Sequence, residues 1–297
     1  MRPPNLIVLS LAALLSFAAT LAGQLSPPPA PPGPAAPPVT ISRSAEHRIA
    51  SAAVGDTFVV QVRLPASYES DAARFPVLYV LDADMSFGLA ADTAGWLAWR
   101  KEIPELIVVG ISYGGTQKDW WQKRSRDMTP TSDRKKVWGD FPLAGGATRF
   151  QDFLAQELFP LVESRHRARA DDRTIVGLSF GGLFGIYTLF TRPELFQRSI
   201  IVAPALAWDE RRILESEAQY RTRHATLSAI VFTAVGDRDD VARIVNPWHE
   251  FNRLIAERNY EGLRWMSHVF PGETHISVYP AAVARGLKRV YESTKPD

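Results

Sequence analysis

The sequence predicts an α/β domain with a mostly parallel central sheet flanked by helices and an antiparallel edge at the N-terminal strands. Three observations predict this class. From about residue 45 onward, short β-branched runs alternate with longer amphipathic stretches. Most of the short runs are apolar at nearly every position, as strands buried on both faces are, whereas 57–64 alternates and suits an edge. The chain has 297 residues, 46% of them hydrophobic and 22% charged, which is enough for one large core.

The predicted strands are short, rich in Val, Ile or Phe, and bounded by turn residues. They are 57–64, 77–81, 106–111, 174–178, 199–202, 230–235 and 263–270. Helical spacing of apolar residues fills most of the gaps between them. The predicted helices are 89–100, 149–165, 183–192, 209–220, 241–258 and 281–291.

One connection, 112–147, is too long for an ordinary crossover and carries Trp120, Trp121 and Trp138 among many charges. Loops of this length are usually functional or disordered. Because aromatic side chains are costly to leave in water, we expect this loop to fold over the carboxyl edge of the sheet, where substrates of such folds bind.

The N-terminus predicts export. No charged residue lies between Arg2 and Arg43, and 6–22 is an apolar run rich in Leu and Ala. We expect 1–22 to be a signal peptide cleaved before Gly23, which makes the protein periplasmic or secreted. If the run stayed uncleaved, it would nearly cross a bilayer and would tether the protein to a membrane.

A Pro/Ala-rich linker, 23–44, follows the predicted signal peptide, and the catalytic domain is predicted at 45–297. Within the linker, 27–38 favours an extended polyproline spacer. A disordered leader without a role is the alternative.

The composition excludes several classes of protein and site. There is no cysteine, which excludes disulfides, thiolate metal sites, a lipid anchor on cysteine and a cysteine nucleophile. The 34 basic and 32 acidic side chains nearly cancel, so the net charge does not indicate a nucleic-acid partner. A small-molecule partner is the expectation, and the oligomeric state stays open.

A G-x-S-x-G motif, 177–181, lies between the predicted strand 174–178 and the predicted helix 183–192. In a strand-to-helix turn the two glycines let the backbone bend sharply and project the hydroxyl of Ser179 above the sheet. The N-terminus of the next helix adds positive potential where negative charge develops. We therefore predict the α/β-hydrolase fold with Ser179 as the nucleophile; a plain tight turn is the alternative.

A serine hydroxyl becomes a good nucleophile when an imidazole takes its proton. Of the six histidines, only His275 occupies a loop just beyond the last predicted strand, downstream of Ser179 as the serine, acid, histidine order requires. We predict His275 as the base, with a surface histidine as the alternative. The other histidines lie in a strand, in helical segments or in connections: His47, His166, His224, His249 and His268.

The third catalytic group should be a carboxylate that follows the strand 230–235 and orients the imidazole. The turn after this strand offers Asp237, Asp239 and Asp240. The third position after the turn glycine, Gly236, selects Asp239, while Asp237 and Asp240 stay open. At least one of the three is expected to cap the helix that begins near Val241.

An oxyanion also needs preorganised donors. The predicted donors are the backbone amides of Phe180, directly after the nucleophile, and of Asp84, in the turn after 77–81. The side chain of Asp84 could equally serve ordinary turn chemistry. This chemistry requires no metal or organic cofactor.

These motifs resemble the Putative esterase family of α/β-hydrolases, which includes esterase D and the enterobactin, salmochelin and bacillibactin siderophore esterases. The resemblance covers nearly the whole chain after about residue 45 and implies the fold and ester chemistry. The segments that carry it are 78–82, 126–130, 145–165, 177–209 and 272–277. Siderophore-type members tend to carry a serine and paired tryptophans after the next strand, where this chain has Ala203 to Trp208.

The leading hypothesis is a carboxylic ester hydrolase that works through an acyl-enzyme, with a siderophore lactone as a candidate substrate. Arg124 and Arg126 together with Trp120 and Trp121 are predicted to meet an anionic, aromatic ligand. A solvated basic loop with tryptophans in the core is the alternative. Other functional alternatives are thioester hydrolysis or acyl transfer, as in S-formylglutathione hydrolases and mycolyl transferases, and an inactive binding protein of the same shape.

Overall fold

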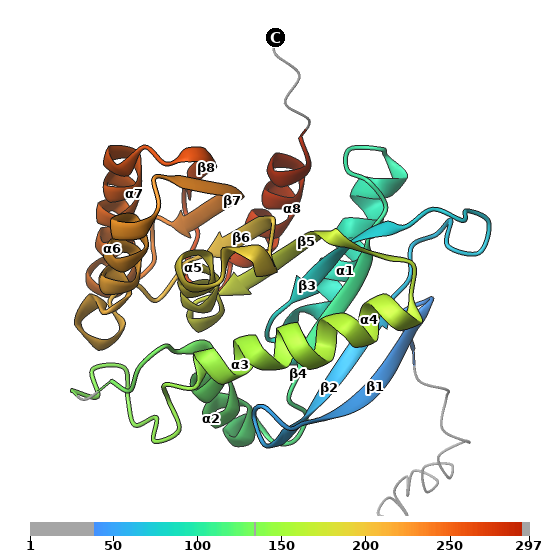
Figure 1. Cartoon of the computed structure of the whole chain (residues 1–297), viewed down its shortest axis with the longest axis horizontal. Helices are drawn as coiled ribbons and strands as arrows, with labels where there is room; N and C mark the ends of the chain where they lie inside the picture. The colour runs from blue at the N-terminus through green and yellow to red at the C-terminus, as the bar shows by residue number, and fades with distance from the viewer. Residues whose placement is uncertain (1–38, 134, 293–297) are drawn as a thin grey trace, which may run out of the picture. The chain divides into compact units, whose positions relative to one another are not determined.

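Figure 1 shows the computed structural model, which describes residues 39–133 and 135–292. The predicted signal peptide, 1–22, and the predicted linker as far as residue 38 lie outside the described residues. The first strand begins at Ser44, where the predicted linker ends.

The strands of the sheet are β1 (Ser44–Ser51), β2 (Asp56–Arg63), β3 (Phe75–Val80), β4 (Ile107–Ser112), β5 (Ala168–Leu178), β6 (Arg198–Val202), β7 (Thr226–Gly236) and β8 (Glu261–Phe270). Their spatial order is β1-β2-β4-β3-β5-β6-β7-β8. β2 pairs antiparallel with both β1 and β4, and every pairing from β4 to β8 is parallel. The predicted mostly parallel sheet with an antiparallel N-terminal edge is confirmed.

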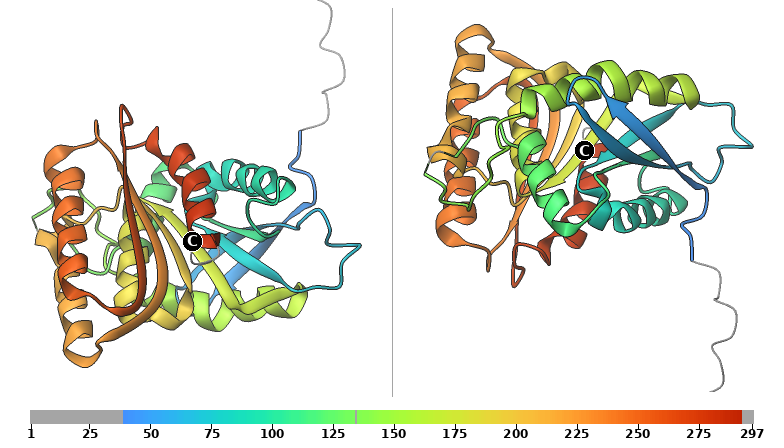
Figure 2. Two further views of the ribbon diagram at one scale, coloured as in Figure 1. Left: turned by 90° about the horizontal axis from the view of Figure 1, so that it is seen from above. Right: turned by 90° about the horizontal axis from the view of Figure 1, so that it is seen from below.

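The helices are α1 (Ala83–Trp99), α2 (Gln117–Met128), α3 (Ala147–Phe153), α4 (Phe159–Arg165), α5 (Phe180–Thr191), α6 (Ile213–Arg223), α7 (Asn246–Arg258) and α8 (Val278–Tyr291). Figure 2 shows α1 and α8 on one face of the sheet, with α3, α4 and α5 on the other. Each face of the central strands is thereby covered, which explains why β3 and β4 are buried along their whole length.

Strand β1 was not predicted, because its side chains carry almost no apolar pattern. Of its eight residues only Ser51 is fully buried. The strand is held by its backbone ladder to β2, which runs from Ser44 opposite Arg63 to Ser51 opposite Asp56. A hydropathy pattern reflects side-chain burial, so it does not predict an edge strand whose side chains are mostly exposed.

Two of the predicted helices contain a π-helical turn, at Leu154–Leu158 and at Val241–Val245. In each case a proline follows in the first turn of the next helix, Pro160 in α4 and Pro247 in α7. A proline has no backbone N–H to donate, and its ring crowds the carbonyl group one turn earlier. The π-helical turn is wider than an α-helical turn and so makes room for the proline ring.

Part of the connection 112–147, expected as a loop, forms the helix α2. A reciprocal cap begins the helix: the Asp119 amide donates to Thr116 Oγ1 at 3.3 Å, and the Thr116 amide donates to Asp119 Oδ2 at 3.1 Å. From α2 the side chain of Arg124 reaches the carbonyl oxygen of Leu178 at the end of β5. The connection therefore lies against the carboxyl edge of the sheet, as expected.

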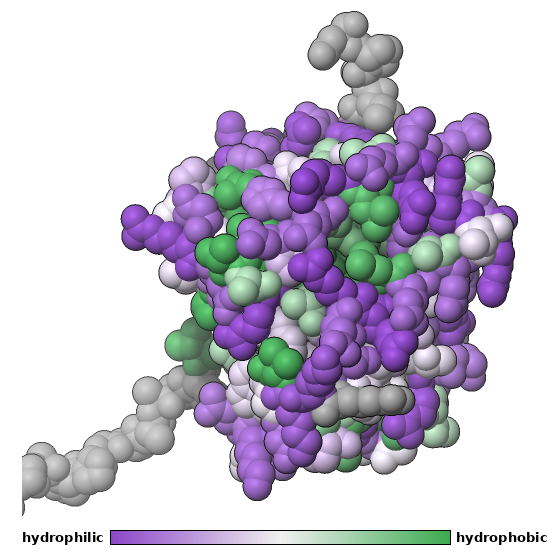
Figure 3. Space-filling view, turned by 90° about the vertical axis from the view of Figure 1, so that its left-hand side faces the viewer, coloured by the Kyte–Doolittle hydropathy of each residue, from purple (hydrophilic) through white to green (hydrophobic). Residues whose placement is uncertain are grey.

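Aromatic packing fixes α3 on the sheet. The ring of Phe58, in β2, stacks on that of Phe153 with centroids 4.1 Å apart, and Phe150 packs against both. Such a pair contributes about 0.5–1.5 kcal/mol beyond the area it buries. The face seen in Figure 3 is mostly polar, with small separate apolar patches.

Neither a membrane-spanning helix nor a metal-binding cluster occurs in the described part of the chain. In the part that the structure describes, no helix is long and apolar enough to cross a membrane. Residues 39–133 and 135–292 also contain no group of three or more His, Cys, Asp or Glu side chains placed to hold a metal ion.

Candidate active site

The residues singled out for catalysis all follow strands at one edge of the sheet. Asp84 follows β3, Ser179 follows β5, Asp239 follows β7 and His275 follows β8. Because β3, β5, β7 and β8 are parallel, their carboxyl ends meet at the same edge. Four turns that are distant in sequence are thereby placed at one edge.

Ser179 adopts a strained backbone conformation at the turn from β5 to α5, with φ 61° and ψ −114°. Positive φ is uncommon for a residue with a side chain and marks functional turns. Neighbouring backbone holds the conformation: the Ser179 amide donates to the Val202 carbonyl at 3.0 Å, and its carbonyl accepts from the Ala205 amide at 3.1 Å. The end of β6 thus fixes the turn from the side.

The glycines of the motif are required by close backbone approach. A Cβ on Gly177 would lie 2.5 Å from the carbonyl carbon of Gly181, which is closer than such atoms come in proteins. The strand therefore enters the turn directly against the first turn of α5. This contact is the structural reason for a glycine before the nucleophile.

Asp239 and His275 form a hydrogen-bonded pair. His275 Nδ1 lies 2.8 Å from Asp239 Oδ2, and the carboxylate side chain is only 3% exposed while the imidazole is 31% exposed. The other carboxylate oxygen accepts from the Asp240 amide at 2.6 Å. With Nδ1–H donating to the carboxylate, Nε2 is the nitrogen that can accept a proton.

The other two acids of the turn have different partners. Asp237 Oδ1 accepts from the Gly272 amide at 2.7 Å and so braces the loop that carries the histidine. Asp240 Oδ1 accepts from the amides of Ala242 and Arg243, and is the helix cap expected in this turn. The hydrogen bond from the Arg243 amide, together with the Arg243 guanidinium, holds the pKa of Asp240 below its usual range.

The turn after β7, which carries Asp239, packs directly against the loop after β8, which carries His275. The Arg238 amide donates to the Glu273 carbonyl at 3.0 Å, and the Asp237 amide donates to the Phe270 carbonyl at 3.1 Å. A Cβ on Gly236 would overlap the Glu273 carbonyl group. The position of the imidazole is thereby set by backbone contacts as well as by the carboxylate.

The predicted oxyanion donors lie at two helix N-termini. Phe180 is the first residue of α5, and Asp84 is the second residue of α1. Within the described residues neither amide donates to a carbonyl, as expected for the first turn of a helix. The side chain of Asp84 binds the end of β4 rather than its own turn, accepting from Ser112 Oγ at 2.6 Å and from the Gly114 amide at 2.9 Å.

Among the described residues, the hydroxyl of Ser179 makes no hydrogen bond to His275, and the imidazole is hydrogen-bonded to Asp239. The structure brings Asp239 and His275 together and places Ser179 at the same edge. Catalytic hydrogen bonds are commonly long before substrate binds.

Comparison with known proteins assigns the family. A family model described as Putative esterase matches residues 51–279, which is most of the chain. The chain belongs to this family. The α/β-hydrolase fold and the identification as an ester hydrolase are confirmed.

Relatives of this esterase cover most of its length. It is 29% identical over 228 residues to ferri-bacillibactin esterase BesA of Bacillus subtilis, spanning 73% of this chain and 78% of that protein. It is 25% identical over 272 residues to the siderophore triacetylfusarinine C esterase of Aspergillus fumigatus, spanning 80% of this chain and 90% of that protein.

Solved structures are also similar to this chain over most of its length. An IroE-like serine hydrolase from Shewanella oneidensis superposes with a TM-score of 0.75 and 26% identity, covering 86% of this chain and 82% of that chain. The BES protein from Bacillus cereus superposes with a TM-score of 0.77 at 24% identity, covering 89% of this chain and 100% of that chain, a likeness that shows the fold alone.

The two tryptophans predicted to contact substrate lie on α2 of the esterase. Trp121 is 41% exposed, whereas Trp120 is half-buried. Trp121 packs against Phe141, whose ring in turn meets Phe180 edge-on with centroids 5.6 Å apart. Trp208 packs on the same Phe180 ring at 4.9 Å. Sequence reasoning did not assign Phe141 or Trp208 to the site. Phe141 lies in the connection between α2 and α3 and Trp208 in the one between β6 and α6, and the path of such connections is not predicted by periodicity.

The two arginines predicted to contact substrate already have carboxylate partners. Arg124 is buried and binds Asp82 through Nε at 2.7 Å and Nη2 at 2.8 Å. Arg126 binds Asp127 in the same way and also reaches Asp56 at 2.9 Å. Neither is the solvated surface cation of the alternative interpretation. Sequence reasoning also missed Asp82, whose left-handed φ of 53° is visible only in the structure.

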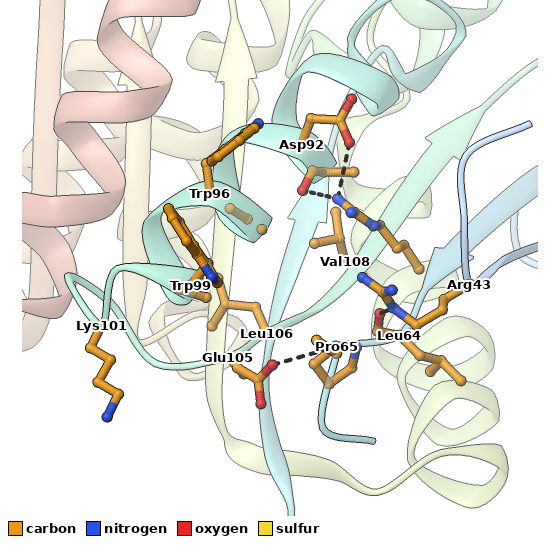
Figure 4. A pocket seen from close by; sticks show the side chains of 16 residues that line it. Arg43, Leu64, Pro65, Asp92, Trp96, Trp99, Lys101, Glu105, Leu106 and Val108 are labelled. Atoms are coloured by element: carbon orange, nitrogen blue, oxygen red, sulfur yellow. Dashed lines mark hydrogen bonds and ion pairs between the residues drawn. The ribbon is translucent and has the colours of Figure 1, made fainter. Parts of the chain in front are cut away.

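A separate pocket of about 550 Å³ lies away from this edge (Figure 4). Trp96 and Trp99 of α1 stand at one side and Arg43 at the other, with Glu105 between them, lower in the view. Its lining includes Leu106, directly before β4, so it sits toward the amino end of that strand, the end opposite to Ser179.

Proposed function

We propose that this esterase is exported to the periplasm or secreted and hydrolyses siderophore esters, with Ser179 as nucleophile, His275 as base and Asp239 as the group that orients the base. The observation that carries the proposal is the Asp239–His275 pair at the same sheet edge as a serine held in a strained turn. A buried carboxylate on Nδ1 leaves Nε2 to take the serine proton.

In the proposed reaction, Ser179 Oγ attacks the ester carbonyl carbon while its proton passes to His275 Nε2. The C–O bond of the ester then breaks, and the imidazolium gives the proton to the leaving alkoxide. Water then attacks the acyl carbon while His275 Nε2 takes its proton; the bond from that carbon to Ser179 Oγ breaks, the acid leaves, and the imidazolium returns the proton to Ser179 Oγ. The amides of Phe180 and Asp84, at two helix N-termini, are the proposed donors to the oxyanion.

The siderophore assignment rests on relatives and on one surface. Both relatives described above are named as siderophore esterases. The exposed ring of Trp121 and the half-buried ring of Phe141 form an aromatic wall that packs on the buried ring of Phe180, next to the nucleophile. Stacking on such a wall suits an aromatic or otherwise planar ligand. The substrate contacts of Trp120, Arg124 and Arg126 stay predictions.

A panel of substrates tests the proposal. Purified enzyme is assayed on p-nitrophenyl esters, thioesters, and iron-loaded and iron-free siderophore esters, with Ser179→Ala as the control. We expect siderophore esters to give the highest kcat/KM and Ser179→Ala to lose at least about a thousandfold on all of them. A preference for thioesters, or activity that survives in Ser179→Ala, would contradict the proposal.

A further inference from the structure

Arg124 joins the two turns that carry the oxyanion donors. Its guanidinium binds the carboxylate of Asp82 in a fork, through Nε at 2.7 Å and Nη2 at 2.8 Å, and its Nη2 also donates to the Leu178 carbonyl at 3.4 Å. Asp82 immediately precedes α1, and Leu178 immediately precedes Ser179. The ladder between β3 and β5 reaches Val80 and Val176, and one buried cation therefore bridges the two chains just beyond it.

The partner of Arg124 is placed by unusual backbone geometry. Asp82 has left-handed φ and ψ of 53° and 41°, a conformation that costs energy for a residue with a side chain. Its carbonyl accepts from the Met85 amide at 3.0 Å, so the same residue begins α1. The carboxylate that binds Arg124 and the amide of Asp84 therefore belong to the same turn, two residues apart.

The guanidinium is closed in by aromatic rings. Its carbon lies 4.9 Å from the Trp120 ring, 5.2 Å from the Trp121 ring and 5.1 Å from the Phe180 ring. The Arg124 side chain is only 4% exposed. A forked, stacked site of this kind suits arginine and does not suit lysine, which has a single charged nitrogen and no planar face.

We propose that Arg124, instead of contacting substrate as predicted from the sequence, is a positioning residue that sets the spacing between the amides of Asp84 and Phe180 and so shapes the oxyanion site. The inference rests on the proposed function. Because donors at an oxyanion site act only at the correct distance, a small shift of either turn lowers the rate of acylation more than it lowers substrate binding.

The test compares Arg124→Lys and Asp82→Asn with wild type on p-nitrophenyl acetate, a neutral ester that needs no cation for binding. We expect kcat to fall about 10- to 100-fold in both variants with KM nearly unchanged, since one oxyanion donor is worth about 100- to 1,000-fold. The double variant should be little worse than either single variant, because both remove the same ion pair.

A second readout separates positioning from general stability. An aryl boronic acid adds to the serine and places an anionic oxygen in the oxyanion site, so its inhibition constant should rise by the same factor as kcat/KM falls. The matched control is Arg258→Lys, since Arg258 binds buried Glu217 with the same fork, Nε at 2.8 Å and Nη2 at 3.0 Å, on α7. It should lose stability without losing kcat.

The outcomes are separable. If kcat is unchanged, or if the whole loss lies in KM, Arg124 is not a positioning residue and the inference is wrong. If Arg124→Lys shows no cooperative thermal transition, the same two criteria are applied to Asp82→Asn, which keeps the shape of the side chain. Activity that persists in Ser179→Ala would instead overturn the proposed function, whatever the Arg124 variants do.

Discussion

The three aspartates of the turn after β7 show how neighbouring residues of one type take separate roles. Asp239 holds the imidazole, Asp237 holds the loop of the imidazole, and Asp240 caps the next helix. Position alone favours Asp239 but does not decide it, because a shift of one residue redirects each side chain. The hydrogen-bond partners distinguish the three.

Replacement of each acid by its amide tests these roles. Asp239→Asn should lower kcat by at least about a thousandfold, because an amide can no longer hold the imidazole in the required tautomer. Asp237→Asn and Asp240→Asn should cost far less. Initial rates on p-nitrophenyl acetate measure the order, and a larger loss in Asp237→Asn or Asp240→Asn than in Asp239→Asn would assign the acid differently.

The helix cap at Asp240 is expected to contribute to the stability of the folded protein. Asp240→Ala should lower the free energy of unfolding by about 1 kcal/mol at neutral pH, as the loss of an N-cap does. The pKa of Asp240 is lowered in the folded state, so its contribution is present above the ordinary carboxyl range and is lost as the pH falls through the folded pKa. Thermal melts of the variant and wild type should therefore differ near pH 7 and converge in acid; a constant difference would show that ionisation is not involved.

Among the structural elements, the strand-turn-helix at Ser179 depends on a glycine where β5 meets α5. Gly177→Ala should destabilise the protein by about 1–3 kcal/mol and lower activity, because the added methyl meets the Gly181 backbone. Gly88→Ala is the matched control: Gly88 lies within α1, and its nearest neighbour to an added methyl is 3.6 Å away.

For Gly88→Ala we expect equal or greater stability, since alanine is favoured over glycine inside a helix. Thermal melting and initial rates are measured on both variants. Equal effects of the two substitutions would refute the close-approach argument for Gly177.

The elements that the sequence predicts well are those whose side chains are buried. The parallel strands and the G-x-S-x-G turn follow from apolar runs and turn glycines, because burial and backbone geometry act on those residues locally. β1 and α2 were missed for different reasons: β1 is held mainly by backbone hydrogen bonds, and α2 is a polar helix whose signal is the cap at Thr116. The Arg124–Asp82 pair joins residues that are far apart in the sequence, and a contact of this kind is not predicted by the spacing of apolar residues.

In the molecule as a whole, the catalytic domain follows a segment with the pattern of an export signal. We expect the exported protein to begin at Gly23 after removal of 1–22. Expression of the full chain in a bacterial host, followed by fractionation and intact mass measurement, checks this. A full-length mass in the membrane fraction would instead indicate the tether formed by an uncleaved segment.

The sheet is expected to make one catalytic unit of two distant residues: Ser179, placed by β5, and His275, placed by β8, although no hydrogen bond joins them among the described residues. Reaction with a fluorophosphonate, followed by peptide mass spectrometry, identifies the residue that is modified and the rate of its modification. The reaction tests the pairing of the two residues because the probe needs both a nucleophile and its base.

We predict a single adduct, on Ser179, formed at least about a thousandfold more slowly in His275→Ala. An adduct on another residue, or the same labelling rate in wild type and His275→Ala, would contradict the pairing of Ser179 with His275.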